Sequence, residues 1–205
     1  MIRYATVAKE ASAEQVIDRS RFIAHIARAH SKEEADAFIA RIRGQYRDAT
    51  HNVPAFIVGE KSELKWTSDD GEPQGTSGPP MLQMLEREGL TNVVCVVTRY
   101  FGGIKLGTGG LVRAYTSSAK LALEAAGVHR VKDVTRMQVS IPYTLLGKLQ
   151  NVEKNEAFTI EETAYTESVA LCLSMDREEE ERVKALLMEL SSGSARFGSI
   201  EHSVE

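Results

Sequence analysis

The sequence is poor in the features that mark disulfide-rich and membrane-spanning proteins. It holds two cysteines among 205 residues, Cys95 and Cys172, and they lie far apart within apolar runs. Such residues are expected as buried, reduced thiols rather than as a disulfide or a metal-binding pair. No apolar run reaches the roughly 20 residues that cross a bilayer, and the first residues lack the apolar core of a secretory signal. A cytoplasmic protein is therefore expected.

Aromatic residues are also scarce, at 6% of the chain. With 42% hydrophobic and 26% charged residues, the remaining composition is that of a globular protein long enough to bury a sizeable core. The net charge of −4 is uneven, with +2 over residues 1–133 and −6 over residues 134–205. Because the acidic segment is a poor surface for nucleic acid, binding residues are expected in the first segment.

Hydrophobic periodicity over residues 134–205 predicts a small α+β domain. Apolar residues alternate along Val134–Ile141, recur at helical spacing from Leu145 to Val152, and alternate again around Phe158 and along Val169–Met175. A helical stripe and a last short strand follow. The order β-α-β-β-α-β is that of a ferredoxin-like domain.

Residues 1–131 are expected to form a separate domain of strands and helices, with the boundary before residue 134. Ser31 is placed to cap a helix that has one apolar stripe, and Val53–Val58 and Val93–Thr98 are typical of buried strands. Further helices are expected after Ser77 and over residues 111–126. The fold class is therefore α+β.

A glycine-rich loop between the strand ending at Thr98 and the following helix is the first candidate site. Five glycines fall between Gly102 and Gly110, and backbone N–H groups at a helix start form a natural anion site. The spacing is not that of a P-loop, because Thr108 stands where lysine is required. A tight packing turn is the open alternative. The candidate anion or nucleic-acid ligands are Arg99, Lys105, Gly107, Thr108, Gly109, Gly110, Arg113 and Lys120.

A second loop, residues 66–79, carries three carboxylates within four residues: Asp69, Asp70 and Glu72. Oxygen ligands at this density suit Mg²⁺ or Ca²⁺, but the spacing does not follow the calcium-loop pattern, and we expect no metal. His51, before the strand at Val53, has the chemistry of a general acid or base. If the protein is an enzyme, these four residues are the expected catalytic groups; a structural role for His51 is the alternative.

Four blocks of sequence stand out: Ser20–Phe22, Asp48–His51, Ser68–Pro73 with Gly75–Gly78, and Thr98–Gly103 with Leu106–Tyr115. In order and spacing they resemble the signature of the IMPACT family, in its bacterial YigZ-like branch. The resemblance implies a first domain that contains a βαβ unit and is like domain IV of elongation factor G, a unit also found in a ribosomal protein. It further implies a ferredoxin-like second domain. The resemblance also implies a link to translation, because the eukaryotic relatives regulate translation. They do so with an additional N-terminal domain, for which this chain is expected to have no room.

Three hypotheses about function follow. In the first, the protein binds RNA or the ribosome in translation regulation, through the glycine loop and the basic helix face. In the second, it is a hydrolase or phosphoryl-handling enzyme with a cleft formed by His51, Asp69–Glu72 and the glycine loop. In the third, both loops are packing joints. No cofactor is expected, and the oligomeric state stays open.

Overall fold

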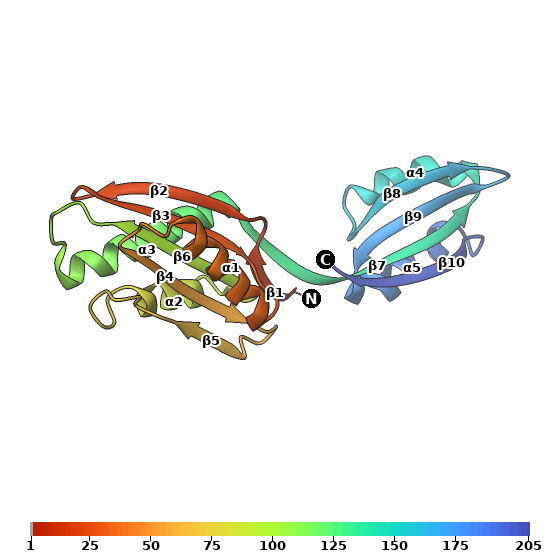
Figure 1. The fold of residues 1–205 in the computed structure, drawn as a ribbon. Helices are drawn as coiled ribbons and strands as arrows, with labels where there is room; N and C mark the ends of the chain where they lie inside the picture. Colours follow the sequence, from red (N-terminus) through yellow and green to blue (C-terminus); the bar gives the residue numbers. More distant parts are fainter. Residues whose placement is uncertain (1) are drawn as a thin grey trace. The chain divides into compact units, whose positions relative to one another are not determined.

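The computed structural model describes residues 2–205, which divide into two compact units (Figure 1). The first unit comprises Tyr4–Arg130, and the second comprises Val131–Glu205 together with residues 2 and 3. Each unit combines a β-sheet with helices, so the expected α+β class is confirmed. No helix within residues 2–205 is both long and apolar enough to cross a membrane.

The first unit is built on a sheet with the strand order β2-β3-β6-β4-β5, in which every neighbouring pair is antiparallel. Because β3 and β4 both pair with β6 from opposite sides, they run parallel to each other, and helix α1 connects them. The expected βαβ element is thus present. The strands of this sheet are β2 (Ala11–Ile17), β3 (Ser20–Arg28), β4 (His51–Val58), β5 (Leu64–Thr67) and β6 (Val93–Tyr100), whereas β1 (Ile2–Val7) belongs to the other sheet.

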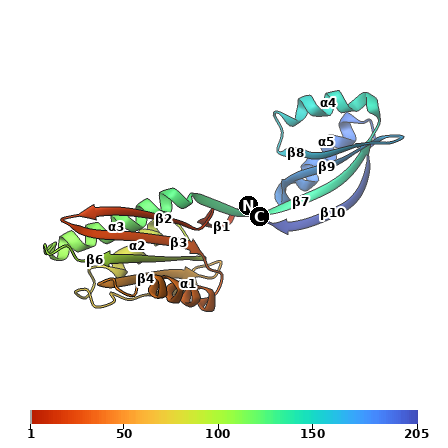
Figure 2. The same cartoon turned by 45° about the horizontal axis from the view of Figure 1, so that its top comes forward.

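Helices cover both faces of this sheet: α1 lies on one face and α2 and α3 lie on the other (Figures 1 and 2). The central strand β6 is consequently buried on both sides. Val94 and Val96 belong to the core under α1, whereas Cys95 and Val97 belong to the core under α2 and α3. This double burial explains why β6 is a continuous apolar run rather than an alternating one. The helices are α1 (Lys32–Gln45), α2 (Gly78–Arg87) and α3 (Gly107–Ala126).

Two elements of the first unit differ from the expectation. Strand β5 was not predicted, and its residues Trp66 and Thr67 fall in the loop expected over residues 66–79. The strand is four residues long, lies at the sheet edge and is largely exposed, so it shows no apolar alternation. Helix α3 begins at Gly107, four residues before the expected Leu111. Its first turn is glycine-rich, and glycine usually indicates a loop rather than a helix.

The other sheet has five strands: it follows the order β1-β7-β9-β8, and β10 also pairs with β7. Its part β10-β7-β9-β8 is the split βαβ arrangement of a ferredoxin-like domain. The helices of the second unit pack apolar residues against one face of the sheet. Strand β7 begins earlier than expected, at Val128, and runs through the division between the units. The elements are β7 (Val128–Ile141), α4 (Tyr143–Glu153), β8 (Phe158–Tyr165), β9 (Val169–Asp176), the 3-10 turn η1 (Arg177–Glu179), α5 (Glu180–Leu190) and β10 (Arg196–Val204).

The N-terminal cap of α1 gives a first test of the fold. Ser31 Oγ accepts a hydrogen bond from Glu34 N at 3.2 Å, so Ser31→Ala is expected to lower the free energy of unfolding by about 1 kcal/mol. The fluorescence of Trp66, the single tryptophan, reports on the first unit during chemical denaturation. Ser31→Asp should restore most of the loss, because aspartate caps as well. An alanine variant with unchanged stability would show that this cap contributes nothing.

Candidate nucleic-acid interface

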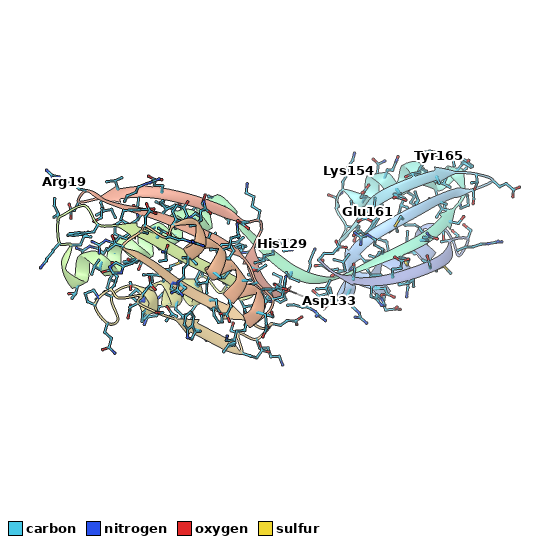
Figure 3. All side chains as sticks on the ribbon, viewed as in Figure 1. Arg19, His129, Asp133, Lys154, Glu161 and Tyr165 are labelled. Atoms are coloured by element: carbon cyan, nitrogen blue, oxygen red, sulfur yellow. The ribbon has the colours of Figure 1, made fainter. Side chains whose placement is uncertain are left out.

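The glycine loop, residues 101–106, leads from β6 into α3 and is held against the turn between β2 and β3. A Cβ atom on Gly102 would lie 2.1 Å from the backbone of Arg19, which sits in that turn (Figure 3). Ser20 Oγ also accepts a hydrogen bond from Gly102 N at 3.2 Å. Gly103 and Gly107 adopt φ values of 85° and 69°, in the left-handed region. Several of the glycines therefore shape the loop itself.

The first turn of α3 is exposed and carries no side-chain cap. The residue before it, Leu106, has no side-chain acceptor to offer to the first N–H groups of the helix. A Cβ atom on Gly109 would meet only Arg113 Nη1, at 3.6 Å, so packing within the chain does not require glycine there. The positive end of a 20-residue helix is thus left open.

Arg99 does not lie on the surface, although the sequence placed it among the phosphate ligands. Its side chain is 6% exposed and forms an ion pair with Glu72, Nη1 to Oε1, at 2.6 Å. The guanidinium also lies 5.4 Å from the ring centroids of both Phe22 and Phe101. The alternation of β6 explains the burial, because Arg99 continues the face of Val97, toward α2 and α3. Its Nε atom is buried without a hydrogen-bond partner.

Glu72 is the centre of a buried polar network. Its Oε1 accepts hydrogen bonds from Arg99 Nη1 and from the hydroxyl of Tyr115, the latter at 2.7 Å. Burial, together with the hydrogen bond to Glu72, raises the pKa of Tyr115, so the phenol stays protonated and donates. His51 Nε2 lies 3.8 Å from the same oxygen, and His51 Nδ1 lies 2.8 Å from the carbonyl oxygen of Asp70. The imidazole of His51 and the carboxylate of Glu72 therefore lie next to each other.

The other two carboxylates point to backbone groups instead. Asp69 accepts hydrogen bonds from the N–H groups of Gly75, Ser77 and Gly78, and so caps α2 from a distance. Burial opposes ionisation of Asp69, but these bonds and one from the Ser77 hydroxyl outweigh it and lower its pKa. Asp70 accepts from the backbone N–H of Asn52 at 2.7 Å and pairs with Arg43 at 2.8 Å.

The carboxylates therefore do not converge on one point. Within residues 2–205, no group of three histidine, cysteine or acidic side chains is placed to hold a metal ion. Of the four expected catalytic residues, the structure brings His51 and Glu72 together and gives Asp69 and Asp70 separate structural partners.

A pocket of about 390 Å³, here called the glycine pocket, opens above the Arg99–Glu72 pair. Residues from the second loop, the end of β6 and the first turn of α3 form its walls. Lys105, Gly107 and Thr108, three of the candidate anion ligands, line it. The full lining is Glu72, Pro73, Arg99, Phe101, Lys105, Leu106, Gly107, Thr108 and Leu111.

A larger hollow of about 800 Å³, here called the basic groove, runs along the other side of α3. Four polar residues that the sequence placed on one helix face all line it: Arg113, Thr116, Ser117 and Lys120. Helix α2 adds Arg87 to this groove; Arg87 is not among the candidate ligands predicted from the sequence, because its place beside α3 depends on tertiary packing. Three cations thus face two carboxylates. The rest of the lining is Ile17, Asp18, Pro80, Gln83, Met84, Glu88, Leu106, Gly110, Val112 and Ala114.

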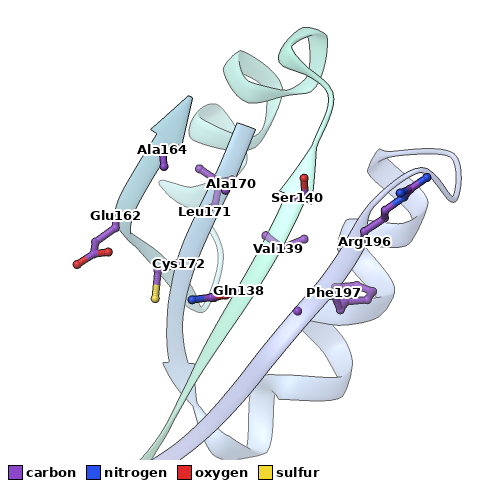
Figure 4. A pocket seen from close by; sticks show the side chains of 11 residues that line it. Gln138, Val139, Ser140, Glu162, Ala164, Ala170, Leu171, Cys172, Arg196 and Phe197 are labelled. Atoms are coloured by element: carbon purple, nitrogen blue, oxygen red, sulfur yellow. The ribbon is translucent and has the colours of Figure 1, made fainter. Parts of the chain in front are cut away.

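A third hollow, of about 330 Å³, lies on the sheet of the second unit (Figure 4). Gln138 and Cys172 lie beside each other on the paired strands β7 and β9, with Glu162 on β8. Burial and the charges of Glu161 and Glu162 raise the pKa of Cys172, so its thiol is not an activated nucleophile. Both cysteines are free, as expected, but only Cys95 is fully buried.

Comparison with known proteins identifies the family. The model of the Impact N-terminal domain matches residues 18–123, and the model of a domain of unknown function (DUF1949) matches residues 139–194. The IMPACT family member YvyE of Bacillus subtilis is 41% identical over 190 residues, covering 93% of this chain and 88% of YvyE. The chain belongs to the IMPACT family.

Two further relatives agree with this assignment. The IMPACT family member YigZ of Escherichia coli is 34% identical over 187 residues, covering 90% of this chain and 92% of YigZ. A crystal structure described as that of a hypothetical protein matches with a TM-score of 0.61 and 32% identity, covering 97% of each chain. The glycine loop, the glycine pocket and the basic groove lie in the part of the chain matched as the Impact N-terminal domain, apart from Ile17 at the groove's edge.

Two glycines of the same loop region give opposite expectations for stability. Gly102→Ala places a methyl group against the Arg19 backbone and should cost about 1–3 kcal/mol, since neither backbone segment can yield freely. Gly109→Ala meets no such obstacle and should leave stability unchanged or slightly higher. Denaturation followed by Trp66 fluorescence compares them. Equal effects of the two changes would contradict the close approach at Gly102.

Removing the carboxylate of Glu72 tests the buried network. Glu72→Gln leaves the Arg99 charge buried without its counter-charge, so a loss of about 3–5 kcal/mol is expected. Adding Arg99→Met to that variant removes the unpaired charge and should recover part of the loss. Urea denaturation of both variants gives the comparison. A single variant as stable as the parent would contradict the assignment of a desolvated ion pair.

Proposed function

We propose that this IMPACT family member is an RNA- or ribosome-binding factor in translation regulation. The observation that carries the proposal is the basic groove beside the open first turn of α3. Arg87, Arg113 and Lys120 line one continuous hollow, with the hydroxyls of Thr116 and Ser117 between them. Lysine, arginine and hydroxyl groups in a row are the usual contacts to a sugar–phosphate backbone.

The residues favour single-stranded or ribosomal RNA over duplex DNA. The groove has three cations against Asp18 and Glu88, and the chain as a whole carries a charge of −4, so tight sequence-independent binding to duplex is not expected. Phe101 is 47% exposed beside the glycine pocket and offers a ring for an unpaired base. Tyr115 is fully buried and does not. The resemblance to elongation factor G domains, which act on the ribosome, points the same way.

The alternative is a hydrolase or phosphoryl-handling enzyme. One observation favours it: His51 and Glu72 meet, and Glu72 lies on the glycine pocket. Against it, Glu72 Oε1 already accepts two hydrogen bonds, and Asp69 and Asp70 hold backbone groups. RNA binding is therefore the better supported function. A metal-dependent phosphoesterase activity that is lost in the variant His51→Gln, in which Glu72 is kept, would instead favour the enzyme.

Binding of a single-stranded RNA oligonucleotide at about 50 mM and about 200 mM salt tests the proposal. The double variant Arg113→Ala, Lys120→Ala should weaken binding about tenfold or more at the lower salt. It should also reduce the slope of log affinity against log salt by about 1.4, because two phosphate contacts are lost. Arg99 is not a suitable position, since its replacement would disturb the core.

The matched control is Lys148→Ala, Lys154→Ala, which removes the same charge from the second unit. This control should bind like the parent protein. Co-sedimentation of all three proteins with ribosomal subunits then asks whether the same groove is used on the ribosome. Salt-independent binding, or an equal loss in both double variants, would contradict the use of the basic groove.

A further inference from the structure

The glycine pocket is distinct from the basic groove and has the features of a site for a single phosphate group. We propose that it binds the phosphate monoester of a nucleotide, with the phosphate at the first turn of α3 and the base against Phe101. The inference deepens the proposed function and rests on it for the source of the nucleotide. That source is either the phosphorylated end of an RNA or a free nucleoside monophosphate.

Hydrogen-bond donors gather at one end of the pocket. Gly107 and Thr108 lie in the uncapped first turn of α3, so their N–H groups have no partner within the helix. The Thr108 hydroxyl and the Lys105 ammonium line the same wall. These groups match the several acceptor oxygens of a phosphate monoester, and its charge of about −1.5 to −2 suits the helix dipole and the lysine. A carboxylate, with two oxygens, would leave donors unused.

Arg99 supplies the second, independent observation. It lines the pocket with a side chain more than nine-tenths buried, and its Nε atom has no hydrogen-bond partner. A buried donor without an acceptor costs free energy, so such groups call for an explanation. The charge of Arg99 is already balanced by Glu72. Glu72 accepts from Nη1 and Ser20 Oγ accepts from Nη2 at 3.3 Å, so Nε is the guanidinium nitrogen that lacks an acceptor. In the proposed complex a phosphate oxygen supplies that acceptor.

Phe101 forms the apolar part of the pocket. Its backbone N–H donates to Thr50 Oγ1 at 3.0 Å, and its ring centroid lies 5.4 Å from the Arg99 guanidinium. These two contacts hold the ring in place, although it remains 47% exposed. A held and exposed aromatic ring is a platform for a base. The pocket volume of about 390 Å³ lies within the range of small-molecule sites.

Two double variants of identical chemistry separate the pocket from the groove. Lys105→Ala, Thr108→Val changes the pocket, whereas Lys120→Ala, Thr116→Val changes the groove. All four positions lie at or near the surface, so both variants should fold. The probes are adenosine 5′-monophosphate, adenosine, and a short RNA with either a 5′-phosphate or a 5′-hydroxyl. Calorimetry measures each affinity for the full chain.

The pocket variant is expected to lose at least tenfold in affinity for adenosine 5′-monophosphate, and the groove variant to keep it. Adenosine should bind at least tenfold more weakly than its monophosphate. A preference for the 5′-phosphorylated RNA that only the pocket variant loses identifies an RNA end as the source, and its absence identifies the free nucleotide. Failure of the parent protein to bind the monophosphate, or equal binding of adenosine, would overturn the inference. RNA binding that depends on the groove would then still support the proposed function.

Discussion

The buried ion pair between Arg99 and Glu72 is the interaction on which the site depends. Two charges are removed from water at one place in the first unit, and each is tolerated only because the other is there. The pair joins the end of β6 to the second loop, and Tyr115 ties the same oxygen to α3. The positions of both loops and of the first turn of α3 are therefore coupled through one carboxylate.

This network explains why several separate motifs occur in one chain. Ser20, His51, Glu72, Arg99 and Tyr115 come from all four sequence blocks, and in the fold they lie around the same buried ion pair. The polar groups of these side chains bond to or lie beside one another in the interior of the first unit. The groups that can meet a partner lie just outside this layer, on the exposed first turn and on the polar face of α3. The polar residues of these blocks therefore have two roles: some form the buried network, and others are exposed to a binding partner.

Much of the fold could be predicted from the sequence, because it rests on local patterns. Helix α1 was predictable from the Ser31 cap and its apolar stripe, and strand β6 from its unbroken apolar run. Each of these signals lies within or beside a single element. Strand β5 could not be found in this way, because an exposed edge strand of four residues is fixed by its pairing with β4 and not by its own pattern.

The candidate site was predictable in position but not in detail. The helix spacing placed Arg113 and Lys120 on one face, and the structure lines one groove with both. Strand alternation places Arg99 on the face of Val97, but it does not show that Glu72, 27 positions away in the chain, pairs with the charge there. Arg87 reaches the groove only through the packing of α2 beside α3. Charge pairing and helix packing between residues far apart in the chain cannot be predicted from local sequence patterns.

Amide NMR of the full chain during titration with a short single-stranded RNA tests the central claim most directly. Chemical-shift changes are expected to concentrate on the first turn of α3, at Gly107–Gly110, and along the basic groove at Arg113 and Lys120. The buried network should change little. Changes confined to the second unit, around Gln138 and Cys172, or no changes at all, would contradict the assignment of the interface to this helix.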